Sequence, residues 1–184
     1  GRVMVLIRLH QSWLRACLHA TIVLLEEKKS VLESQLIKDA VISEGEFNAS
    51  SQKLTAEESE AITSQLELVK DELAENYERQ GMAFYENLQN CLPFYDGRRE
   101  KIERETSAYQ HALTRAVVAF KRASSNAPET YLYDLELAKC YRKQKEPIAT
   151  VLHSFKIAVD NAPEFLEPLY QLHAARCRSL LTVP

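Results

Sequence analysis

The stretch Phe120–Glu129, FKRASSNAPE, returns 35 positions later as Phe155–Glu164, FKIAVDNAPE. A period of about 35 residues is typical of helix-pair solenoids, in which each unit buries its apolar face against its neighbours. Such stacks present an extended surface to partner proteins. The repeat therefore predicts a scaffold, although it does not identify the partner.

The spacing inside the first copy matches the second helix of a tetratricopeptide repeat. Ala116 and Ala123 flank Phe120, and Pro128 follows at the turn. Small residues at these positions admit the neighbouring helix, and proline ends the turn. The second copy keeps Phe155 but has Val151 in place of the first alanine, so the repeat is degenerate.

Two further helices are expected beside these copies. Pro128–Gln144 carries the leucine, small residue and aromatic residue of a tetratricopeptide first helix, at Leu137, Ala138 and Tyr141. Pro147 then lies in the turn or opens the next helix, and a third first helix is expected over Glu164–Leu181.

Composition favours an all-α protein. The chain of 184 residues has only four glycines and six prolines, and 46% of its residues are hydrophobic. Few turn residues and many helix formers predict antiparallel helix pairs stacked as a tetratricopeptide-like α-solenoid fragment. The net charge of −3 gives no basic excess for nucleic-acid binding, so no direct nucleic-acid contact is expected.

The first half of the chain is expected to be helical as well. Val3–Ile42 has mixed three- and four-residue apolar spacing, which indicates one long helix or two consecutive ones. Ser43–Leu54 loses this period and is expected to be a loop or a splice over missing residues. Thr55 and Glu58 have the spacing of a capping box, which predicts a helix start.

The helix that follows Thr55 has one narrow apolar stripe and a strongly acidic remainder. Between Glu57 and Glu78, Lys70 alone opposes eight acidic residues. The stripe residues are Ile62, Leu66, Val69, Leu73 and Tyr77. We divide the chain into an N-terminal helical segment with a loop (1–54), an acidic helical segment (55–106) and the degenerate repeats (107–184).

Neither a membrane span nor a disulfide framework is expected. Charged and histidine residues interrupt the apolar stretches Val3–Ile7 and Ala20–Leu25 well before a bilayer thickness is reached. The cysteines are scattered, which is typical of reduced thiols in a cytosolic or nuclear protein. They are Cys17, Cys91, Cys140 and Cys177.

Motifs for chemistry are weak, so we predict no catalytic, cofactor-binding or metal-binding residues and no enzyme. The glycines stand alone and form no phosphate loop. His173 and Cys177 have a metal-compatible spacing but lack a second pair of ligands. Apolar neighbours indicate that Cys140 is a core thiol. A helical enzyme would need convergent polar groups that periodicity cannot reveal.

A basic groove is the candidate partner-binding site. Lys139, Arg142 and Lys143 are expected on the concave face, with Tyr170 and Arg178 from the next unit, and would suit acidic segments. A solvated helix face is the simpler explanation of the same charges. Leu135 and Lys139 stand where carboxylate clamps of this repeat class hold lysine and asparagine, which disfavours such a clamp.

Two stretches carry a closer resemblance. Thr130–Cys140, TYLYDLELAKC, and Pro168–Leu181, PLYQLHAARCRSLL, resemble the calcineurin-binding protein family, the large helical-repeat subunits of the HIRA-type histone chaperone complex. The resemblance covers about Ser107–Leu181. No segment matches the family's calcineurin association, so that activity is not transferred.

The resemblance implies a non-enzymatic scaffold in the nucleus that supports replication-independent H3–H4 deposition and nucleosome assembly. Its partners would be protein subunits of the HIRA-type complex, with H3–H4 as further candidates for the acidic helix. The alternative is a generic tetratricopeptide adaptor that recruits another protein through its concave groove.

Overall fold

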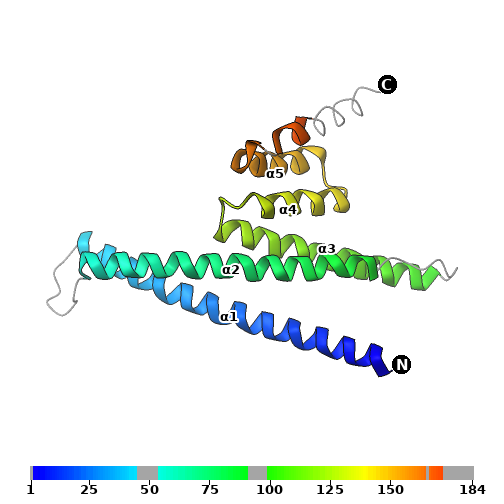
Figure 1. Cartoon of the computed structure of the whole chain (residues 1–184), viewed down its shortest axis with the longest axis horizontal. Helices are drawn as coiled ribbons and strands as arrows, with labels where there is room; N and C mark the ends of the chain where they lie inside the picture. Colours follow the sequence, from blue (N-terminus) through cyan, green and yellow to red (C-terminus); the bar gives the residue numbers. More distant parts are fainter. Residues whose placement is uncertain (1, 45–53, 91–98, 165, 172–184) are drawn as a thin grey trace. The chain divides into compact units, whose positions relative to one another are not determined.

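The computed structural model describes residues 2–44, 54–90, 99–164 and 166–171, which are helical apart from short connections (Figure 1). The helices pack as sequential antiparallel pairs, and no strand occurs in these residues, which confirms the predicted all-α class. They are α1 (Arg2–Glu44), α2 (Ala56–Asn90), α3 (Arg99–Asn126), α4 (Tyr131–Gln144) and α5 (Ile148–Asn161). Residues 163–164 and 166–171, which follow α5, are also helical. None of the described helices is long and apolar enough to cross a membrane.

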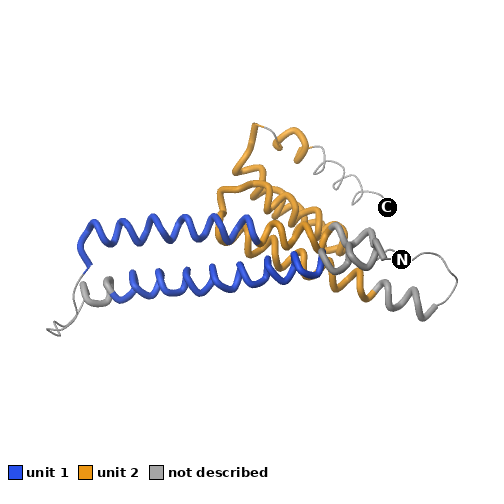
Figure 2. Tube along the Cα trace, turned by 60° about the horizontal axis from the view of Figure 1, so that its bottom comes forward, with its two compact units in different colours: residues 1–76 blue, residues 77–184 orange. Residues whose placement is uncertain are grey.

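The chain divides into two compact units, Gly1–Asn76 (unit 1) and Tyr77–Pro184 (unit 2), shown in Figure 2. The division falls inside α2. The boundaries drawn from sequence follow composition and periodicity instead: 54/55 precedes α2, which begins at Ala56, and 106/107 lies within α3. Periodicity marks where a helix ends, but it does not report which half of a long helix packs with which neighbours.

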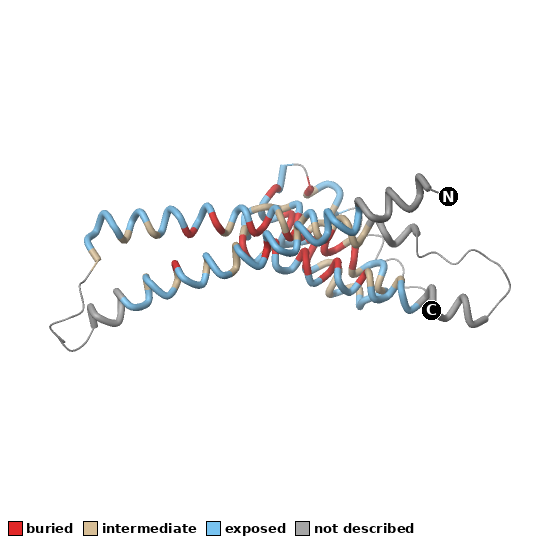
Figure 3. Tube along the Cα trace, turned by 90° about the horizontal axis from the view of Figure 1, so that it is seen from below, coloured by how far each residue is buried: buried red, intermediate tan, exposed pale blue. Residues whose placement is uncertain are grey.

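The segment Val3–Ile42, for which the sequence left open one helix or two, lies within a single long helix of unit 1. α1 runs unbroken from Arg2 to Glu44, so Ser43 and Glu44 are helical rather than part of the expected loop. Residues 45–53 of that loop lie outside the described residues. Ile22 and Leu32 are buried on α1, while Leu24 is 65% exposed. Most of the described positions of α1 are exposed, as the burial colours of Figure 3 show.

The predicted start of α2 is confirmed. The Glu58 amide donates to Thr55 Oγ1 at 3.2 Å, and the Thr55 amide donates to Glu58 Oε2 at 2.8 Å. The bonds from the backbone and hydroxyl of Thr55 lower the pKa of Glu58, because they stabilise its ionised form. Of the predicted stripe, Leu66, Val69, Leu73 and Tyr77 are buried and Ile62 is half-buried.

Unit 2 is built around the repeated phenylalanines. Phe120 is fully buried in a cluster with Leu113, Ala116, Val117, Leu137 and Cys140. Phe155 belongs to a second cluster with Ala138, Ala158, Val159, Ala162 and Leu166. α4 contributes to both clusters and so joins the two copies of the repeat into one stack.

The repeated turn also links the two copies directly. Asn161, in the second NAP sequence, donates from Nδ2 to the carbonyl oxygen of Pro128 in the first, at 2.7 Å. Between them, α4 ends as predicted at Gln144 and is followed by Lys145 in the left-handed conformation, with φ of 60°. Pro147 is the N-cap residue of α5, which decides between the two positions expected for it.

Candidate functional site

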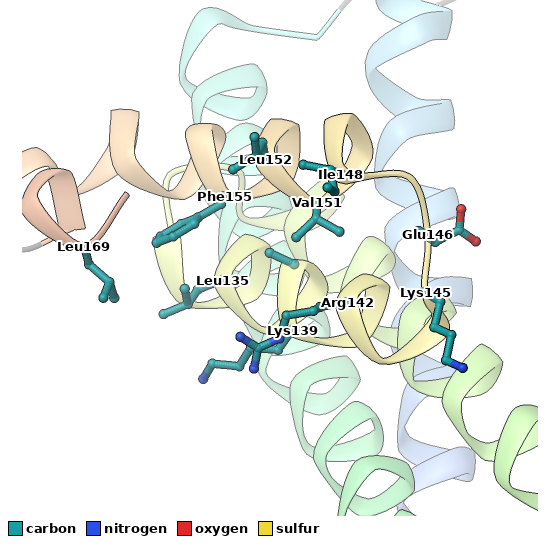
Figure 4. A pocket seen from close by; sticks show the side chains of 11 residues that line it. Leu135, Lys139, Arg142, Lys145, Glu146, Ile148, Val151, Leu152, Phe155 and Leu169 are labelled. Atoms are coloured by element: carbon teal, nitrogen blue, oxygen red, sulfur yellow. The ribbon is translucent and has the colours of Figure 1, made fainter. Parts of the chain in front are cut away.

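A pocket of about 490 Å³ is lined by residues of α4, of α5 and of the connection between them, together with Leu169 (Figure 4). All of its lining residues belong to unit 2. Its walls are mainly apolar, formed by Leu135, Ile148, Val151, Leu152, Phe155 and Leu169. A concave apolar site with a few polar groups at its edge is the usual form of a ligand site.

Phe155, the aromatic residue of the pocket wall, packs against a second aromatic ring. The ring of Phe155 meets the ring of Tyr170 edge to face, with centroids 5.5 Å apart and an interplanar angle of 80°. This geometry is favourable for aromatic pairs. Tyr170, which the sequence assigned to partner binding, therefore supports the pocket wall and is not itself one of the lining residues.

The polar edge of the pocket is mostly cationic. Lys139 and Arg142 extend from α4 along one side, while Lys145 and Glu146 lie at the end where α4 turns into α5 (Figure 4). The Lys139 ammonium is paired with Glu136 Oε1 at 2.5 Å. Arg142 and Lys145 are exposed and form no ion pair within the described residues.

The structure separates the residues that the sequence grouped as one basic site. Lys139 and Arg142 line the pocket, but the Lys143 ammonium lies over the ring of Tyr85, 5.4 Å from its centroid. Successive helix residues differ by about 100° in direction, so Arg142 and Lys143 serve different faces of α4. Arg178 lies outside the described residues.

Sequence reasoning missed the wall that α5 contributes. Ile148, Val151, Leu152 and Phe155 have spacings of three, one and three, which place them on one face of a helix. That signal was present in the sequence. It could not show that this stripe is left partly open rather than covered, because the openness depends on how the next helix is placed.

Two buried polar groups of α4, the Cys140 thiol and the Asp134 carboxyl, do not line the pocket. The Cys140 thiol is fully buried, and burial raises its pKa to about 12, so it stays protonated at neutral pH. The prediction of a core thiol is confirmed. Asp134 is 3% exposed, and the Ser124 hydroxyl bonds its two carboxylate oxygens at 3.2 and 3.1 Å.

The buried Asp134 carboxyl is expected to make the free energy of unfolding depend on pH. Burial raises its pKa above the usual 3.8, partly opposed by the Ser124 hydrogen bond and His153. The folded state therefore binds the proton more tightly than the unfolded state, and stability falls as pH rises from the unfolded pKa through the folded one. We expect Asp134→Asn to raise the free energy of unfolding at pH 7, because the amide carries no charge that burial would destabilise.

Urea unfolding of both proteins between pH 3 and pH 8 tests this expectation. The advantage of Asp134→Asn over the parent should grow as pH rises and then level off. Glu129→Gln, an exposed carboxyl on the preceding turn, is the matched control and should leave the pH profile unchanged. An advantage that shrinks with rising pH would contradict the assignment.

The acidic residues of α2 form an exposed face. Its carboxylates from Glu57 to Glu75 are all exposed, and Lys70 pairs with Glu67 at 3.0 Å. Within the described part of the chain, no group of three or more histidine, cysteine or acidic side chains is arranged to hold a metal ion. The His173 and Cys177 pair falls outside that part.

No protein-family model, no curated protein and no solved structure matches the chain.

Proposed function

We propose that this chain is a non-enzymatic scaffold that binds other proteins through a tetratricopeptide-like solenoid. The observation that carries the proposal is the pocket in unit 2, which has apolar walls and a cationic edge on a stack of antiparallel helices. The repeated phenylalanines are packing residues, so the stack serves to hold this surface in place.

We further propose that the scaffold belongs to a nuclear histone chaperone complex of the HIRA type and supports replication-independent H3–H4 deposition. The support for this is the resemblance of about Ser107–Leu181 to the calcineurin-binding protein family. The exposed acidic face of α2 is compatible with basic histones, because clustered carboxylates attract opposite charge at short range.

Affinity capture tests this function. The immobilised chain is expected to enrich other chaperone subunits or H3–H4 from nuclear extract, and mass spectrometry identifies the captured proteins. The capture is done at about 0.15 M ionic strength, where salt screens surface charges as it does under physiological conditions. A variant with Asp71→Asn, Glu72→Gln and Glu75→Gln should lose histone enrichment without losing helicity. If the parent chain enriches neither histones nor chaperone subunits, the proposed function is wrong.

A generic adaptor is the second candidate, and the pocket favours it because such a site needs no histone partner. Its usual device, a clamp for a terminal carboxylate, is disfavoured here, since Leu135 lies in the apolar wall and Lys139 already pairs with Glu136. Capture of one defined client, without histones or chaperone subunits, would support the adaptor over the chaperone scaffold.

A further inference from the structure

We propose that the unit 2 pocket binds an acidic segment of a partner protein, in which one apolar anchor side chain is flanked by carboxylates. This rests on the proposed function of a protein-binding scaffold and adds the chemistry of the partner. Two features of the pocket lead to it: the apolar interior selects the anchor, and the charged edge selects its neighbours.

The interior is suited to an aliphatic or aromatic side chain. Leu135, Val151, Leu152 and Phe155 form its walls, and Leu169, which is 42% exposed, stands at its mouth. A volume of about 490 Å³ lies within the range of sites that enclose small ligands. Burying an anchor there removes apolar surface from water on both partners, which drives association.

The edge is suited to carboxylates. Arg142 lies beside Lys139 along the α4 side of the mouth (Figure 4), and Arg142 has no ion pair within the described residues. Lys139 is already paired with Glu136, so Arg142 and Lys145 are the lining cations without an ion pair in the described part of the chain, and Arg142 is the one on the α4 side. A guanidinium can hold a carboxylate with two parallel hydrogen bonds.

The basic residues at the end of α4 also have a simpler explanation than ligand binding. Basic residues in the last turn of a helix stabilise its C-terminal dipole, and this applies equally to Arg142 and Lys143. The two side chains differ in direction, however, since Lys143 lies over Tyr85 and Arg142 lines the pocket. The pair therefore provides a matched comparison on one helix turn.

Other candidate occupants of the pocket either match its cationic edge less well or can be distinguished by experiment. Residues 172–184 of the chain carry Arg176 and Arg178 and no acidic residue, so they would bring like charge to the edge. Histones are basic and are disfavoured for the same reason. A second copy could offer Leu68, which is 65% exposed on the acidic face of α2.

Fluorescence anisotropy with three labelled synthetic peptides tests the proposal on the full chain. The first is an alanine-based helix with one central leucine flanked by glutamates, the second has lysines in place of the glutamates, and the third has alanine in place of the leucine. Only the first is expected to bind. Equal binding of the lysine peptide, or no binding of the glutamate peptide, would overturn the proposal.

Paired variants locate the binding. Arg142→Glu should weaken binding of the glutamate peptide at least about tenfold, because an attractive charge pair removed from water is replaced by repulsion between like charges. Lys143→Glu should change the affinity less than about twofold. Leu152→Asp in the wall should abolish binding, and Ile157→Asp, at a position of α5 that does not line the pocket, should not. Circular dichroism of each variant shows whether the helices are retained, and equal losses in the two members of either pair would overturn the assignment.

The remaining outcomes identify a different occupant or a failure elsewhere. Tighter peptide binding by a Leu180→Asp, Leu181→Asp variant would show that the chain's own end fills the pocket, and concentration-dependent sedimentation abolished by Leu68→Asp would show a second copy there. Either result overturns an external partner. Peptide binding that persists while nuclear extract yields no chaperone subunit or histone would instead reject the proposed function and leave the pocket assignment standing.

Discussion

Replacing Phe120 with alanine is expected to lower the free energy of unfolding of unit 2 by about 3–5 kcal/mol, the usual cost of deleting a buried aromatic ring. The ring is fully buried, and its cluster includes Leu113 from its own helix and Leu137 and Cys140 from α4. Helices on two sides lose contacts at once, so the cavity cannot collapse easily. Because domains are stable by only about 5–15 kcal/mol, much of unit 2 should unfold under mild conditions.

Urea unfolding followed by circular dichroism measures this effect. Val118→Ala is the control, since Val118 lies on the same helix but is 46% exposed and should cost less than about 0.5 kcal/mol. The glutamate peptide should also lose its site in Phe120→Ala, because α4 carries Arg142 and packs against this cluster. A Phe120→Ala protein as stable as the control would mean that the repeat motif is not the core of unit 2.

Local features of the fold could be predicted from the sequence because they depend on neighbours along the chain. The capping box at Thr55 and Glu58 needs only three residues of separation, and the end of α4 at Gln144 follows from a period that stops. The buried stripe of α2 needs only that some partner lies beside it. None of these predictions required knowledge of how one helix is oriented on another.

Features that depend on the orientation between helices could not be predicted in the same way. Arg142 and Lys143 are adjacent in sequence and alike in charge, yet one lines the pocket and the other lies over Tyr85. The repeated NAP sequence likewise gave no sign that Asn161 would donate to Pro128 in the other copy. A basic cluster therefore indicated the helix on which a site lies, but not which of its side chains belong to the site.

Gly81 lies close to the buried ring of Phe120, and Gly81→Val is expected to destabilise unit 2 by about 2–3 kcal/mol. A Cβ at this position would lie 2.9 Å from both Cε1 and Cζ of Phe120. That distance is shorter than ordinary van der Waals contact, and the ring is fully buried, so it cannot swing out into solvent. Valine has a higher helix propensity than glycine, but this gain offsets less than about 1 kcal/mol of the steric cost. The net effect on the free energy of unfolding is therefore destabilising.

A double-mutant cycle with Phe120→Leu separates overpacking from any other effect of the substitution. Leucine removes the edge of the ring that a side chain at residue 81 would meet, so Gly81→Val should cost less in the Phe120→Leu background, with a coupling energy of about 0.5–3 kcal/mol. Ala61→Val, at an exposed position of α2, controls for helix propensity and should cost less than about 0.7 kcal/mol. Strictly additive costs in the urea unfolding cycle would show that the close approach of Gly81 to Phe120 does not limit this core.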